Sequence, residues 1–112
     1  MRFVMTFLFF VAAVPALRAQ TPAGNAQNGK KIFSSYGCYQ CHGFEAQGGA
    51  GARLAPRPIA FTAFSKYVRQ PTGEMPPYTS KVVSDKELAD IYAFLQSIPQ
   101  PPPANSIPLL SK

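Results

Sequence analysis

The chain has 112 residues, and its 11 Lys or Arg against five Asp or Glu give a formal charge of +6. This length allows one small domain, which is only marginally stable unless something reinforces its core. The basic residues are scattered rather than clustered, so the composition argues against nucleic-acid binding. A mild positive field fits either simple solubility or encounters with an acidic protein partner.

Residues 1–19 have the order of a secretory signal peptide: Arg2 comes first, an apolar run fills residues 3–14, and small residues lead to Ala19. We expect cleavage after Ala19 and export to the periplasm. The loss of two arginines then leaves nine basic and five acidic residues, a formal charge of +4. The alternative is a retained membrane anchor, but the apolar run is shorter than the roughly 20 residues that span a bilayer. We therefore expect no stable membrane insertion after cleavage.

The expected domain covers residues 20–99, and its first helix begins after Asn25, whose side chain can cap it. The apolar positions of this helix recur at helical spacing; they are Gly29, Ile32, Phe33 and Tyr36. Gly37 stands where a glycine commonly ends a helix. Further on, residues 47–58 are rich in Gly, Ala and Pro, which predicts an irregular loop.

A short helix is expected where apolar residues return to helical spacing, at Phe61, Phe64 and Val68. The opposite side of this helix carries Lys66 and Arg69. The proline that follows disfavours helical backbone in the residue before it, so the helix ends there.

The last helix has the clearest signal, a capping box formed by Ser84 and Glu87. Its apolar stripe is Leu88, Ile91, Phe94, Leu95 and Ile98, and Pro99 ends it. Residues 100–112 form a Pro-rich tail, for which we expect an extended backbone. No strand pattern is convincing, so the sequence predicts an all-α domain of short helices joined by loops.

The stretch Cys38-Tyr39-Gln40-Cys41-His42 contains both cysteines and the only histidine. A thioredoxin-like redox pair would lie in a βαβ pattern, which this sequence lacks. A structural zinc site needs four ligands, and this stretch offers three at most. The remaining interpretation is covalent attachment of a c-type haem, in which Cys38 and Cys41 form thioethers and His42 ligates the iron. The export signal agrees with it, since c-type maturation takes place outside the cytoplasm.

His42 can supply one axial ligand through Nε2 while its Nδ1–H donates to a backbone carbonyl. For the opposite position we expect Met75, the only methionine left after removal of the signal. It precedes two prolines that hold the backbone extended, and His/Met ligation is a low-spin pairing that raises the reduction potential. The alternative role for Met75 is to fill a gap in the core.

With these residues in this order, the chain resembles the class I cytochrome c family over nearly all of its mature length. The resemblance implies an all-α fold in which the N- and C-terminal helices cross and short helices and loops wrap around one covalently bound haem. Gly29 and Phe33 resemble the family's residues at that crossing, with Ile91 and Phe94 as their partners. Leu54 resembles the leucine that packs on the haem face.

One departure from the family concerns the segment Gly51-Ala52-Arg53-Leu54, where the family usually has Gly-Pro-x-Leu. In the family, the carbonyl of that proline accepts the hydrogen bond from the histidine Nδ1–H. Ala52 keeps a carbonyl but lacks the fixed φ of proline. We therefore expect a longer or more mobile hydrogen bond from His42 and an altered reduction potential.

The sequence thus predicts a periplasmic single-haem electron-transfer protein that cycles iron between Fe(III) and Fe(II) and meets redox protein partners. We expect no catalysis by this chain alone, because Met75 fills the sixth position and the acidic residues show no paired arrangement. Two alternatives stay open. One is a cytochrome subunit dedicated to a periplasmic dehydrogenase, for which the tail is the hint. The other is a haem sensor or enzyme with an open sixth position.

Overall fold

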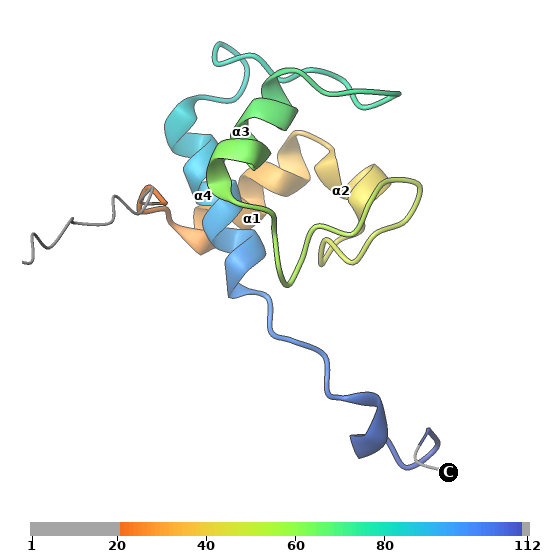
Figure 1. The fold of residues 1–112 in the computed structure, drawn as a ribbon. Helices are drawn as coiled ribbons and strands as arrows, with labels where there is room; N and C mark the ends of the chain where they lie inside the picture. Colours follow the sequence, from red (N-terminus) through yellow and green to blue (C-terminus); the bar gives the residue numbers. More distant parts are fainter. Residues whose placement is uncertain (1–20, 111–112) are drawn as a thin grey trace, which may run out of the picture.

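The computed structural model describes residues 21–110, and the expected signal peptide, residues 1–19, lies outside them. This part of the chain consists of helices and loops without strands (Figure 1). The helices are α1 (Ala26–Ser35), α2 (Cys38–His42), α3 (Phe61–Arg69), α4 (Asp85–Ser97) and the 3₁₀-helix η1 (Ala104–Ser106). The predicted all-α class is confirmed. Within the described residues, none of these helices is long and apolar enough to cross a bilayer.

Helix α1 begins and ends where the sequence predicts. Asn25 Oδ1 accepts a hydrogen bond from the Asn28 N–H at 2.9 Å, which satisfies one of the free donors of the first turn. Tyr36 caps the other end, and Gly37 then turns the chain into α2 with a φ of +76°. This left-handed conformation is one that glycine adopts without strain. The buried face of α1 is formed by Gly29, Ile32 and Phe33.

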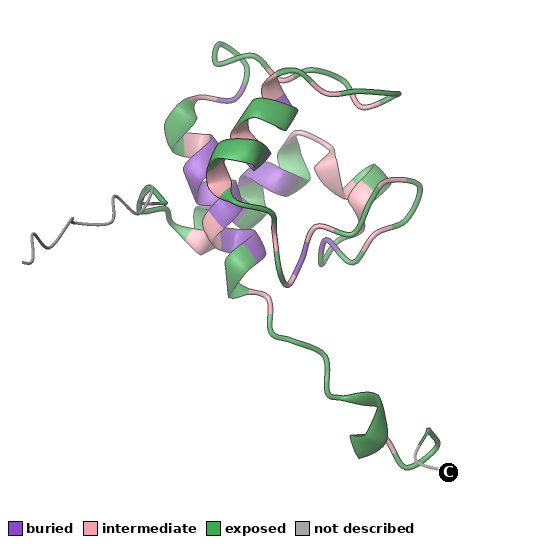
Figure 2. Cartoon of the chain, in the orientation of Figure 1, coloured by how far each residue is buried: buried purple, intermediate pink, exposed green. Residues whose placement is uncertain are grey.

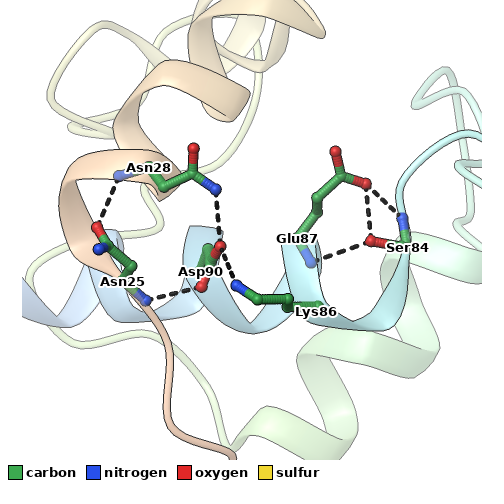
Figure 3. Close-up of polar contacts among 6 residues, drawn as sticks. All are labelled: Asn25, Asn28, Ser84, Lys86, Glu87 and Asp90. Atoms are coloured by element: carbon green, nitrogen blue, oxygen red, sulfur yellow. Dashed lines mark hydrogen bonds and ion pairs between the residues drawn. The ribbon is translucent and has the colours of Figure 1, made fainter.

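Helix α4 contributes a large share of the buried residues (Figure 2). Its capping box forms as predicted (Figure 3): Glu87 Oε2 accepts from the Ser84 N–H at 2.8 Å, and Ser84 Oγ accepts from the Glu87 N–H at 3.3 Å. The hydrogen bonds from Ser84 lower the pKa of the Glu87 carboxyl. The predicted apolar stripe is buried as far as Leu95, whereas Ile98 caps the helix end and is half-buried.

Helices α1 and α4 meet backbone to backbone. A Cβ atom at Gly29 would overlap the carbonyl of Asp90, so only glycine allows the helices to approach this closely. Next to this contact, the rings of Phe33 and Phe94 pack with their centroids 5.4 Å apart. The predicted crossing of the N- and C-terminal helices is therefore confirmed.

Asp90 is a buried carboxylate at this crossing, only 1% exposed, and its sequence pattern did not single it out. It accepts hydrogen bonds from Asn25 N–H at 2.7 Å, Asn28 Nδ2 at 2.8 Å and Lys86 Nζ at 3.2 Å (Figure 3). The bonds from Asn25 and Asn28 lower the pKa of Asp90 despite its burial, so the carboxylate is charged at neutral pH. Asp90 thereby ties the first turn of α1 to the middle of α4.

Helix α3 occupies the predicted residues and packs on α4 through aromatic rings. The rings of Phe61 and Phe64 lie 5.2 and 5.3 Å from that of Tyr92, measured between centroids. Phe64 and Val68 are buried, as their spacing predicts. The Tyr92 hydroxyl also donates to the Ile59 carbonyl at 3.0 Å, which fixes the chain just before α3.

The tail after α4 extends away from the helical body (Figure 1) and is almost entirely exposed (Figure 2). The extended backbone that the prolines predict is interrupted by η1. There the Ile107 N–H donates to the Ala104 carbonyl at 3.2 Å and the Ser106 N–H to the Pro103 carbonyl at 2.9 Å. The sequence-based expectation is wrong at this turn because local hydrogen bonds form just beyond the proline run.

Candidate haem-attachment site

Cys38, Cys41 and His42 lie on the single short helix α2. Residues three apart on a helix are neighbours on its surface, so both thiols lie on the same side of α2. Neither forms a disulfide; Cys38 is half-buried and Cys41 exposed. Burial raises the pKa of the Cys38 thiol above its ordinary value of 9.0, although a backbone hydrogen bond opposes this, so the thiol is protonated at neutral pH.

The loop after α2 folds back onto it through backbone hydrogen bonds. Gly48 N–H donates to the His42 carbonyl at 2.8 Å, and Gly51 N–H donates to the Cys41 carbonyl at 2.8 Å. These bonds also satisfy carbonyls at the C-terminal end of α2 that have no partner within the helix. The predicted irregular loop is therefore ordered around the histidine.

His42 is oriented by the carbonyl of Ala52, which lies 2.6 Å from Nδ1. A carbonyl oxygen only accepts hydrogen bonds, so Nδ1 carries the proton and the lone pair of Nε2 is left for a metal. The prediction that alanine at this position gives a longer hydrogen bond is wrong. The surrounding loop bonds hold the Ala52 carbonyl without the fixed φ of proline.

Gly51 is a site residue whose role the sequence pattern did not reveal. A Cβ atom there would lie 2.9 Å from His42 Cε1, 3.0 Å from Nδ1 and 3.2 Å from the Cβ of Cys41. Such distances are tighter than ordinary van der Waals contact, so a side chain at this position would push the imidazole aside. The only signal in the sequence is the glycine of the Gly51-Ala52-Arg53-Leu54 segment.

The other residues expected at the site are brought to one core. The half-buried apolar residues that pack against it are Tyr36, Cys38, Tyr39, Leu54, Phe61, Met75, Tyr78 and Ile98. Leu54 and Met75 come from separate loops, so the fold unites residues that are distant in sequence. Sulfur and imidazole donors together with partly open hydrocarbon surface are what an attached haem requires. The residues present therefore fit this group.

The segment that carries Met75 is fixed at Tyr78. The Tyr78 N–H donates to the Val68 carbonyl at 3.0 Å, and the Tyr78 hydroxyl donates to the Tyr36 carbonyl at 2.9 Å. Burial raises the pKa of the Tyr78 hydroxyl, and the neighbouring cysteines add to the effect. The hydroxyl is therefore a neutral donor at physiological pH.

Arg69 is another residue whose role the sequence pattern did not reveal, since helical spacing placed it opposite the apolar side of its helix. Its side chain is only 19% exposed, and its guanidinium donates to two backbone carbonyls and to Asp85. Helical periodicity could not reveal this, because the partners lie in a loop and in the next helix.

A comparison with protein families shows to which family the chain belongs. The family described as "Cytochrome C oxidase, cbb3-type, subunit III" matches residues 24–95, from just before α1 to near the end of α4. The chain belongs to the c-type cytochromes. As a class I cytochrome c, it carries covalently bound haem c with its iron and transfers electrons to and from redox partners. No curated protein and no solved structure matches it significantly.

Proposed function

We propose that this cytochrome is an exported, periplasmic carrier of single electrons whose haem is held by Cys38 and Cys41 and ligated by His42 and Met75. The observation that carries the proposal is the hydrogen bond between His42 Nδ1 and the Ala52 carbonyl, which leaves Nε2 for iron on the same short helix as both thiols. The haem supplies the exchange between Fe(III) and Fe(II). The chain positions the haem and shields it.

The half-buried apolar residues support a shielding role. Leu54, Phe61 and Tyr78 pack against the core without being covered completely by the chain. A cofactor face laid on them would be removed from water, and apolar burial contributes roughly 25 cal/mol per Å². Burial and axial ligation are among the protein contributions that set the reduction potential, together with hydrogen bonds to the axial histidine.

Met75 is the sixth ligand in this proposal. It is half-buried and packs against the same core as Cys38. Two prolines follow it and restrict its backbone. A thioether at the sixth position favours Fe(II) and leaves no site for a substrate at the iron. This is the basis for an electron carrier rather than a sensor or an enzyme.

Carbon monoxide binding to the reduced protein tests the sixth ligand. The native protein is expected to bind carbon monoxide poorly, and Met75→Ala is expected to bind it readily because the position is open. Glu74→Ala is a matched control, since this neighbouring side chain is exposed. Equal binding by the native protein and Met75→Ala would contradict the ligation and favour the sensor or enzyme alternative.

Export is tested separately by the mass of the protein recovered from the periplasm. Cleavage after Ala19 predicts a mature chain that begins at Gln20 and carries the haem. A membrane-bound product that keeps residues 1–19 would contradict a free carrier and show that the protein is anchored.

The positive charge supports an acidic redox partner. The nine basic and five acidic residues of the mature chain give a formal charge of +4, and its long-range attraction for an acidic partner is screened by salt within about 10 Å at 0.1 M ionic strength. Electron exchange with an acidic partner is therefore expected to slow as salt is added. A rate that is independent of ionic strength would remove electrostatic steering from the proposal.

A dedicated subunit of a periplasmic dehydrogenase is the second candidate, and the tail favours it. Leu109 and Leu110 are 84% and 62% exposed, beyond the part of the chain that the family covers. Exposed apolar side chains on an extended tail suit docking to a partner. Leu109→Ser with Leu110→Ser should weaken co-purification with a partner as much as deletion of residues 100–112 does. If deletion leaves every interaction intact, the free carrier is the better description.

A further inference from the structure

We propose that Arg69 is the positioning residue that holds the Met75 loop in place for iron ligation. The proposal rests on the proposed ligation by Met75. Arg69 lies on α3, outside the Cys38–His42 motif, and positions the sixth ligand indirectly. The proposal follows from the three hydrogen bonds of its guanidinium.

The Arg69 guanidinium joins three separate points of the chain. Nη1 donates to the carbonyls of Tyr78 at 2.8 Å and Val83 at 2.6 Å, and Nη2 donates to Asp85 Oδ1 at 2.6 Å. Two of these acceptors lie at the ends of the segment between the Met75 loop and α4. One planar side chain on α3 therefore closes this whole segment onto the helical body.

The two sides of Met75 are held very differently. After it, Tyr78 is fixed by Arg69, by its own N–H to Val68 and by its hydroxyl to Tyr36. Before it, between α3 and Met75, the side-chain hydrogen bonds of the described residues are those of the exposed Tyr67 hydroxyl with Thr72, at 3.3 Å to the carbonyl and 3.0 Å to Oγ1. Met75 is thus positioned mainly from its C-terminal side.

The three hydrogen bonds of Arg69 differ in strength. Asp85 has a side chain that is 87% exposed, so its ion pair with Arg69 is solvated and contributes little. The bonds to the Tyr78 and Val83 carbonyls are partly buried and charge-assisted, which makes them the strong ones. A lysine presents a single ammonium instead of a planar fork and cannot reproduce this arrangement.

The test measures how easily imidazole displaces Met75 from the oxidised haem. Arg69→Gln and Arg69→Lys are expected to raise the affinity for imidazole about tenfold, because charge-assisted bonds that hold the loop are lost. Asp85→Asn should change it less than about threefold. Lys66→Gln is the matched control: it removes the same charge from the exposed side of the same helix and should change nothing.

Hydrogen exchange at the Tyr78 amide gives a second measurement that does not involve the haem. The amide should exchange about tenfold faster in Arg69→Lys, while amides in α1 and α4 stay protected. If Arg69→Gln fails to fold, Arg69→Lys decides the question, since it keeps the charge and the length of the side chain. Unchanged imidazole affinity and unchanged exchange in Arg69→Lys would overturn the proposal.

The spectrum of the native protein separates this proposal from the one on which it rests. If the oxidised native protein lacks the charge-transfer absorption of a sulfur–iron bond, both Met75 ligation and the role of Arg69 are contradicted. A native protein that has this absorption, together with Arg69 variants that bind imidazole like the native protein, leaves Met75 ligation in place and removes only the role of Arg69.

Discussion

The α1–α4 crossing and the side of the molecule that carries the haem motif are completed by different means. At the crossing, Gly29 lies against the Asp90 backbone and the Phe33 and Phe94 rings are buried, so the polypeptide supplies every contact. On the other side, Leu54 and Met75 pack on the core yet remain partly exposed. The first region is a closed core, whereas the second leaves apolar side chains partly open. We expect the attached haem to cover this open surface and so to reinforce a small domain in which Cys38 and Cys41 form no disulfide.

The largest effect that would test this comparison is expected from Gly29→Ala. In an exposed helix interior, this change is stabilising by up to about 1 kcal/mol. Here the new Cβ overlaps the Asp90 carbonyl, so we expect a loss of about 3 kcal/mol or more in the free energy of unfolding, measured with denaturant on the haem-loaded protein.

Gly73→Ala is the matched control for that measurement. Gly73 has a φ of +70° but no atom within 4 Å of the place where a Cβ would lie. Only the strain of the left-handed conformation remains, about 1 kcal/mol. Equal losses in the two variants would show that the α1–α4 contact is not as close as described.

A smaller effect is expected from Asp90→Asn, which keeps the shape but removes the buried charge. Bonds to charged groups contribute about 2 kcal/mol, so the variant should lose roughly that amount at neutral pH. Because the pKa of Asp90 is lowered in the folded state, its contribution is present above the ordinary value of 3.8 and disappears as pH falls through the lowered value. The difference in the free energy of unfolding between the native protein and Asp90→Asn should therefore become smaller at acidic pH.

The control for Asp90→Asn is Glu74→Gln, which removes an exposed charge. Unfolding curves at neutral and at acidic pH should separate the Asp90 variant from it. A loss in Asp90→Asn that stays constant across pH would assign the effect to packing instead of to the ionised carboxylate.

The smallest effect is expected from Ala52→Pro, which restores the residue that the family usually has. The Ala52 carbonyl already lies 2.6 Å from His42 Nδ1, so the proline has little left to improve. We expect the reduction potential to change by well under about 60 mV, the value for a tenfold ratio in a one-electron couple. A larger change would mean that the hydrogen bond is weaker in solution than this geometry implies.

The sequence predicted α1, α3 and α4 well because their signals are local, whereas the short helix α2 was not predicted. The Asn25 cap, the Ser84 capping box and the proline after α3 each act within a few residues, and the structure has helices at these places. The crossing could be predicted at Gly29 because the family resemblance supplied a long-range contact. The turn η1 in the tail was missed, since a proline run gives no signal for the residues that follow it.

Asp90 at the crossing and the supporting residues of the site could not be predicted, because their contacts join separate elements of the chain. Asp90 lies on α4, and 65 residues separate it from Asn25, whose N–H it accepts. Arg69 acts on carbonyls of a loop, and Gly51 matters only through its contact with the His42 ring. Composition and helical spacing carry no information about such contacts. The haem-attachment motif could be predicted, since all of its reactive side chains lie in the five consecutive residues 38–42.

The most direct measurement of the central claim is mass analysis of tryptic peptides from the exported protein after acid–acetone treatment. Cleavage after Lys31 and Arg53 releases residues 32–53, which contain Cys38, Cys41 and His42. We predict that this peptide keeps the red colour and has the mass of the peptide plus one haem. A colourless peptide with the mass of the unmodified sequence would contradict the account.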